Sequence, residues 1–132
     1  MPCDLADRQA LRRVGGLSTE LDDVTEVWHL AAVYDLTVDR ETALRVNVDG
    51  TARVLDFCHS RPEFHRLQHV STCYVSGRYP GVFTESQLEE GQRFNNFYEE
   101  TKFLAEVEVQ RAMREGLPCS IYRPSIVVGD SR

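Results

Sequence analysis

The chain has 132 residues, 42% of them hydrophobic, and a chain of this length can bury about two-thirds of its unfolded surface in one domain. Its 15 basic and 21 acidic residues give a net charge of −6, with no basic stripe interleaved with aromatic residues. This balance argues against a nucleic-acid partner and an anionic membrane surface, and no apolar run approaches the length of a membrane span.

Cysteine and histidine usage indicates an intracellular protein without a metal site. The four cysteines are Cys3, Cys58, Cys73 and Cys119. They are widely spaced, without a CxxC pair, and three of them lie in apolar segments. We interpret them as reduced, buried residues of a cytoplasmic protein. The four histidines lack carboxylates or cysteines at metal-ligand spacing, so we expect no metal ligands.

The first apolar run, Val24 to Tyr34, is rich in β-branched and aromatic residues and predicts a strand covered on both faces. A helix follows, with Asp39 as its cap and a stop at Arg61-Pro62. Helical spacing places five residues on one face of it: Leu44, Val48, Thr51, Leu55 and Cys58.

The rest of the chain repeats this alternation. Leu67 to Val75 predicts a second strand, and the loop Arg78 to Gly91 follows, long enough to cover a site. A second helix runs from about Asn96 to Glu115, with Leu104, Val107 and Met113 apolar, and stops at Gly116-Leu117-Pro118. Cys119 to Val128 predicts the third strand.

The order strand, helix, strand, helix, strand predicts an α/β fold: a partial doubly wound parallel sheet with flanking helices. Ligands of such sheets bind beyond the carboxyl ends of the strands. We therefore expect a site near His29 to Tyr34, Ser71 to Gly77 and Arg123 to Gly129.

Lys102 is the one lysine among fifteen basic residues, and it follows Tyr98 by one helical turn. The two side chains therefore share a helix face. An ammonium near a phenol favours the phenolate, which brings tyrosine closer to acid/base use at neutral pH. At the end of the second predicted strand, a hydroxyl could bind a substrate carbonyl; Thr72 is our first choice and Ser71 the second.

Five segments, in this order and spacing, resemble the extended short-chain dehydrogenase/reductase family. They are HLAA at 29–32, NVDGT at 47–51, VSTCYVSG at 70–77, YEETK at 98–102 and RPSIVVG at 123–129. The residues of these segments are most similar to those of the branch with fatty acyl-CoA reductases and thioester reductase domains. Sugar-nucleotide epimerases and dehydratases are the next most similar.

The resemblance implies an NAD(P)-dependent oxidoreductase that acts on a carbonyl or acyl thioester. It implies Tyr98 as the acid/base, Lys102 as the group that lowers the pKa of Tyr98 and binds the nicotinamide ribose, and Thr72 as the carbonyl-orienting hydroxyl. The implied cofactor-binding residues are Tyr98 and Lys102 together with Asp4, Leu5, Leu30, Ala31, Ala32, Asn47 and Pro124. Taken singly, Thr72 could merely cap the backbone, and Asn47 could merely bond within its helix.

The glycine-rich turn of the family's dinucleotide site has no counterpart in this sequence. We therefore interpret residues 1–132 as a single partial NAD(P)-binding Rossmann domain, the middle part, lacking the N-terminal βαβ unit and the C-terminal substrate domain. The alternatives are an epimerase or dehydratase, and a catalytically silent fragment or pairing module. An open sheet edge would permit self-association.

Overall fold

The computed structural model describes residues 21–129. Its elements in chain order are β1 (Glu26–His29), α2 (Arg40–Ala43), the π turn η2 (Leu44–Val48), α3 (Asp49–His59), β2 (Arg66–Val70), the 3₁₀ turn η3 (Cys73–Ser76), α4 (Phe97–Arg114) and β3 (Cys119–Tyr122).

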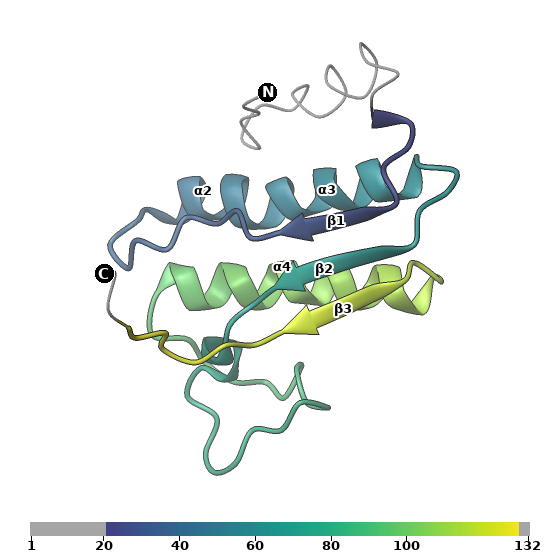
Figure 1. Ribbon diagram of the computed structural model, residues 1–132. Coiled ribbons are helices and arrows are strands. Elements are labelled where there is room, and N and C mark those ends of the chain that lie inside the picture. Colours follow the sequence, from purple (N-terminus) through teal and green to yellow (C-terminus); the bar gives the residue numbers. More distant parts are fainter. Residues whose placement is uncertain (1–20, 130–132) are drawn as a thin grey trace.

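The three strands form one parallel sheet in the order β1-β2-β3 (Figure 1). Val27 lies opposite Leu67, which lies opposite Cys119. This arrangement confirms the predicted α/β class and places the carboxyl ends of all three strands at one edge. Each strand is shorter than the apolar run that predicted it, because the last residues of each run leave the sheet and form that edge.

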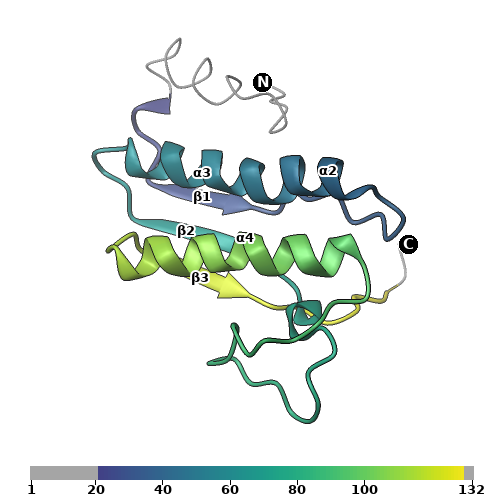
Figure 2. The same ribbon diagram turned by 180° about the vertical axis from the view of Figure 1, so that it is seen from behind.

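The helices α3 and α4 lie side by side on one face of the sheet (Figures 1 and 2). The core between them and the sheet consists of Val54, Leu55, Cys58, Leu67, Val109, Ala112, Leu117 and Cys119. Within residues 21–129, no helix covers the other face, where Trp28 and Tyr122 stack with 59% and 44% exposure. The prediction of strands covered on both faces is therefore wrong for the described part of the chain.

The first helical segment begins at its predicted cap, where the Asp39 carboxylate accepts a hydrogen bond from the Thr42 amide at 2.9 Å. The π turn η2 then inserts an extra residue into the helical repeat. As a result Ala43 and Asn47 are buried, whereas Leu44 and Val48 are only half-buried. The predicted apolar face is thus correct from Thr51 onward. Before Thr51, the buried residues lie one position earlier in the sequence than predicted.

The helix α4 matches its predicted bounds because both ends carry clear signals. Asn96 caps it by accepting from the Glu99 amide at 2.9 Å, and Gly116 follows its end with φ 104°. Its buried face is small and polar instead of apolar: Glu99, Thr101, Lys102, Ala105, Glu106, Val109 and Ala112. The apolar Met113 is 39% exposed. The helix can bury these polar groups because they have partners in the sheet and the loop.

Among the described cysteines, Cys58 and Cys119 are buried, Cys73 is half-buried, and all three are free thiols. Cys3 lies outside the described residues. Across residues 21–129, no helix combines the length and apolarity needed to cross a membrane.

Candidate active site

Two predicted site residues meet at the carboxyl edge of the sheet. Thr72 has extended backbone after β2, and its hydroxyl caps η3 by accepting from the Tyr74 amide at 3.3 Å. Tyr98 lies in the first turn of α4, and its phenol is close enough to the Thr72 side chain for Thr72 to lower the pKa of the phenol. The pair thus presents two hydroxyls to one point, as an acid/base and a carbonyl-orienting group require.

The phenol of Tyr98 is held in its neutral form. Burial raises its pKa above the usual value, and the neighbouring Cys73 and Tyr74 raise it further, while the Thr72 side chain opposes the shift. Lys102 is not among the described groups that move the pKa of Tyr98, in contrast to the expected lowering. In this state Tyr98 is a proton donor.

Lys102 lies one turn further along α4, with 4% of its surface exposed, and its ammonium donates to the Val70 carbonyl at 2.8 Å. Burial lowers its pKa to about 8, and the carboxylate of Glu106 opposes this shift. An ammonium has three donors, so Lys102 retains donors for a ligand hydroxyl at the end of β2.

Two imidazoles lie behind Lys102, and sequence reasoning did not assign them a place in the site. His29 and His69 are register partners, with ring centroids 5.4 Å apart. Thr51 donates to the Asn47 carbonyl, so His29 must donate through Nε2 to the Thr51 hydroxyl at 2.9 Å. The sequence signal that could have indicated this pair is the equivalent position of the two histidines near the ends of two parallel strands.

Burial lowers the pKa of His29 to about 4, and the Lys102 ammonium contributes to this shift. His69 also has its pKa lowered by burial, and neither of its ring nitrogens has a hydrogen-bond partner among the described residues. Both imidazoles are therefore neutral at pH 7. Residues 21–129 contain no group of three His, Cys, Asp or Glu side chains placed to hold a metal ion.

Asn47 is buried, with 2% exposure, and all its side-chain bonds are internal. Its amide accepts from the Val33 N–H at 2.8 Å and donates to the Val33 carbonyl at 3.1 Å and to Thr101 at 3.0 Å. These bonds reach beyond its own helix. Asn47 therefore fixes the segment after β1 against α4.

The remaining expected cofactor residues lie at the same edge. Leu30 and Ala31 are exposed after β1, Ala32 is half-buried, and Pro124 is exposed after β3. The Pro124 carbonyl accepts from the Cys73 amide at 3.0 Å, which joins it to the strand end that carries Thr72. Asp4 and Leu5 lie outside the described residues.

This edge fits the nicotinamide end of a dinucleotide. Leu30 leaves 63% of its surface uncovered, as an apolar wall for a ring would, and the alanines beside it leave room. The Lys102 ammonium has donors left for ribose hydroxyls.

A buried ion pair next to Ser71 was also missed by sequence reasoning. The Glu106 carboxylate is fully buried and lies 2.6 Å from the Arg123 guanidinium. It also accepts a hydrogen bond from the Ser71 hydroxyl. Ser71, our second choice for the carbonyl-binding hydroxyl, is thus occupied by Glu106, which leaves Thr72 as the hydroxyl beside Tyr98.

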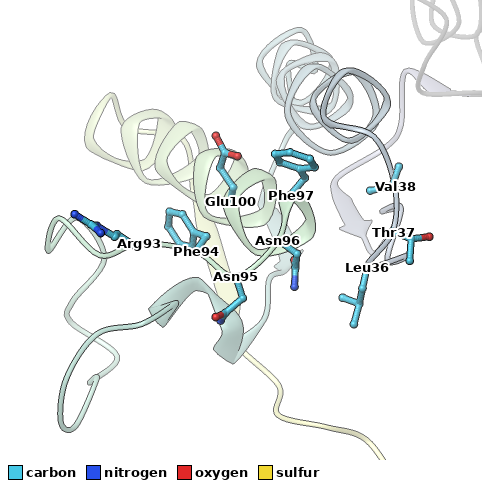
Figure 3. Close-up of a pocket in the computed structure, with 9 residues that line it drawn as sticks. All are labelled: Leu36, Thr37, Val38, Arg93, Phe94, Asn95, Asn96, Phe97 and Glu100. Carbon is cyan, nitrogen blue, oxygen red and sulfur yellow. The ribbon is translucent and has the colours of Figure 1, made fainter.

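A cavity of about 540 Å³ opens beside the first turn of α4. Leu36 and Val38 lie on one side of it, and Phe94 lies on the other (Figure 3). The Arg40 guanidinium, 2.6 Å from the Glu100 carboxylate, ties α2 to α4 next to this cavity. Phe94 and Phe97, which also line it, lie shortly before Tyr98 in the sequence.

Comparison with known proteins shows what this chain is similar to. The family model described as Male sterility protein, an NAD-binding model, matches residues 16–132. The Drosophila melanogaster protein named "Putative fatty acyl-CoA reductase CG8306" is 29% identical over 83% of this chain and 26% of its own length. Aldehyde reductase lnaA of Aspergillus flavus is 27% identical over 80% of this chain and 11% of its own length. The chain thus spans about a quarter or less of these two relatives.

Solved structures agree with this assignment. The terminal R domain of the myxalamid PKS-NRPS pathway is similar over 100% of this chain and 34% of that chain, with TM-score 0.81 and 29% identity. UDP-glucuronic acid 4-epimerase of Bacillus cereus, solved with NAD, is similar over 85% of this chain and 36% of that chain, with TM-score 0.71 and 26% identity.

Proposed function

The chain belongs to the male sterility protein family of extended short-chain dehydrogenase/reductases, and from this premise we propose that it serves an NAD(P)-dependent reduction of a carbonyl or acyl thioester. The observation that carries the proposal is that Thr72, which follows β2, and Tyr98, in the first turn of α4, bring two hydroxyls close together at the carboxyl edge of the sheet. The Drosophila and Aspergillus relatives, named as reductases of an acyl-CoA and an aldehyde, support this class of substrate.

Each residue of the pair has a defined task in this reaction. Thr72 donates a hydrogen bond to the substrate carbonyl oxygen and holds it next to the phenol. Tyr98, neutral because of its raised pKa, gives its proton to that oxygen as negative charge develops there. A bound nicotinamide supplies the hydride for the carbonyl carbon.

Other residues of this edge would hold the cofactor. Lys102 would donate to ribose hydroxyls from its place beside the Val70 carbonyl. Leu30, Ala31, Ala32 and Pro124 would line the nicotinamide end, while Asn47 would act by fixing Val33. We further propose that Asp4 and Leu5 contact the adenine.

The substitution Tyr98→Phe tests the proposal. It removes the transferable proton and keeps the ring, so we expect turnover to fall about 100-fold or more with an unchanged Kd for NADPH. Tyr122→Phe is the matched control, because Tyr122 lies on the uncovered face of the sheet with 44% exposure. Steady-state consumption of NADPH and a fluorescence titration measure the two quantities. Full turnover in Tyr98→Phe would refute the role of Tyr98.

The second candidate function is that of an NAD-dependent epimerase or dehydratase, which the similarity to the Bacillus epimerase favours. Such an enzyme regenerates its cofactor in each cycle, so it would show no net consumption of NADPH. The third alternative, a catalytically silent chain, predicts no binding of NADPH or NADH at micromolar concentrations.

We infer that the protein is cytoplasmic and that it acts on a small molecule. We also infer that this chain is the middle part of a larger Rossmann domain. In the described part of the chain β1 pairs only with β2, so in residues 1–132 taken alone the other edge of β1 would be open to a second copy. Dimers that appear with rising concentration in sedimentation velocity would support this association.

A further inference from the structure

Arg123 and Glu106 form an ion pair that the proposed chemistry does not use. Glu106 is fully buried, and the Arg123 side chain is 13% exposed. The guanidinium donates through Nε to Glu106 Oε2 at 3.2 Å and through Nη2 to Glu106 Oε1 at 2.6 Å, the forked geometry of a strong pair. Removing either partner would leave an uncompensated buried charge, which is strongly destabilising.

The same guanidinium holds the loop between η3 and α4. Its Nη2 donates to the Gln87 carbonyl at 2.8 Å, its Nη1 donates to the Thr84 carbonyl at 3.3 Å, and it lies 5.6 Å from the centre of the Phe83 ring. Arg123 thus binds Glu106 through Nε and Nη2 and, at the same time, the loop carbonyls through Nη1 and Nη2. A lysine at this position has one nitrogen and could not do so.

The base of the loop is closed independently of Arg123. The Arg78 amide donates to the Arg93 carbonyl at 2.8 Å, and the Gln92 side chain donates to the Val75 carbonyl at 2.8 Å. The loop can therefore stay attached while its far part, around Thr84 and Gln87, depends on Arg123.

The ion pair also reaches the strand that carries the proposed site. Glu106 accepts from the Ser71 hydroxyl, and the Ser71 amide donates to the Tyr122 carbonyl at 2.7 Å. Ser71 immediately precedes Thr72. One charge pair therefore connects β2, β3, α4 and the loop.

The loop forms one side of a cavity of about 500 Å³ whose lining includes Cys73 and Glu99, the residues that follow Thr72 and Tyr98 in the sequence. Phe83 and Thr84 line it from the loop, Cys73 and Tyr74 line it from η3, and Arg123 lies between the two sides. A shift of the loop would widen this cavity without moving Tyr98 or Lys102.

We propose that Arg123, oriented by Glu106, is a positioning residue that holds the 78–92 loop as a wall of the substrate cavity. This inference rests on the proposed reductase function for its kinetic part only. Arg123 touches no reacting atom in this arrangement, so its loss weakens substrate binding more than the chemical step.

Arg123→Lys in the full protein is the test, because it keeps the charge and removes the fork. Hydrogen exchange of the 78–92 amides is expected to rise about ten-fold or more, with the amides of β2 unchanged. The KM for the carbonyl substrate is expected to rise about ten-fold, with kcat within two-fold and the Kd for NADPH unchanged. Arg111→Lys, at a 61% exposed position of α4, is the matched control.

Glu106→Gln is the second variant, since it keeps the shape of the side chain and removes its charge; it is expected to loosen the same loop. Unchanged loop exchange in both folded variants would overturn the proposal, and so would a fall in kcat with an unchanged KM. If the unaltered protein shows no turnover, the proposed function fails, and the exchange measurement alone decides whether Arg123 holds the loop.

Discussion

At the residue scale, the buried imidazole of His29 makes stability depend on pH. Its pKa is about 4 in the folded chain against 6.5 when exposed. Below pH 6.5 the unfolded chain binds a proton that the folded chain does not, so the free energy of unfolding falls as the pH drops from 6.5 toward 4. This change amounts to at most about 3 kcal/mol. Urea unfolding at pH 7.0, 5.5 and 4.5 measures it.

Variants separate His29 from the other groups that titrate in this range. His29→Gln is expected to reduce the loss of unfolding free energy between pH 7.0 and 4.5, because glutamine binds no proton. His69, whose pKa is lowered by burial, would retain a loss of the same sign. His65→Gln, at an exposed position, is the control for the substitution itself. An equal pH dependence in all three proteins would contradict the buried, neutral state of His29.

Residue patterns predicted the positions of the candidate site residues better than their supporting contacts. The spacing of Tyr98 and Lys102 and the position of Thr72 at a strand end depend on local sequence, so they could be read directly. The partners of Asn47 and Arg123 lie far away in sequence, at Val33, Thr101, Glu106 and the loop. Sequence without structure gives no signal for such distant contacts.

At the scale of elements, helix ends were predictable and helix faces were less so. Asp39, Asn96 and Gly116 act through neighbouring backbone groups, which a short stretch of sequence specifies. The π turn at Leu44–Val48 instead contains Asn47, whose bonds to Val33 and Thr101 join it to distant parts of the chain. That turn rotates the preceding face of the helix, which the regular repeat could not indicate.

Gly77 controls the exit of the chain from η3 into the loop. Its φ is 50°, and a Cβ there would lie 2.3 Å from the Arg93 carbonyl oxygen. Gly77→Ala must therefore move the base of the loop, and we expect it to lower the free energy of unfolding by about 3 kcal/mol. Thermal and urea unfolding measure the loss.

Gly81→Ala is the matched control for this clash. Gly81 also has a positive φ, 98°, but a Cβ there meets no atom within 4 Å. It should cost only about 1 kcal/mol for the backbone conformation. Equal losses in the two variants would show that the contact with Arg93 is not limiting.

At the scale of the whole molecule, the sheet buries one face and leaves the other polar and aromatic. On the uncovered face, Tyr122 donates to the Gln68 side chain at 2.9 Å, and Gln68 donates to Glu26 at 2.7 Å. The apolar runs in the sequence do not show which face is covered, because they contain hydrophobic residues of both faces: Val27 and Ile121 face the core, while Trp28 and Tyr122 face outward. Hydrophobic content alone does not distinguish a covered aromatic residue from an exposed one.

The asymmetry of the sheet predicts unequal costs for two large-to-small substitutions on adjacent strands. Leu67 is fully buried under the helices, so Leu67→Ala should lower the free energy of unfolding by about 3 kcal/mol through lost burial and a cavity. Trp28 is 59% exposed on the opposite face, so Trp28→Ala should cost about 1 kcal/mol or less despite the larger side chain. Urea unfolding followed by circular dichroism compares them without relying on tryptophan fluorescence. A cost for Trp28→Ala as large as that for Leu67→Ala would mean that the outer face is covered in solution, since only burial makes an indole so stabilising.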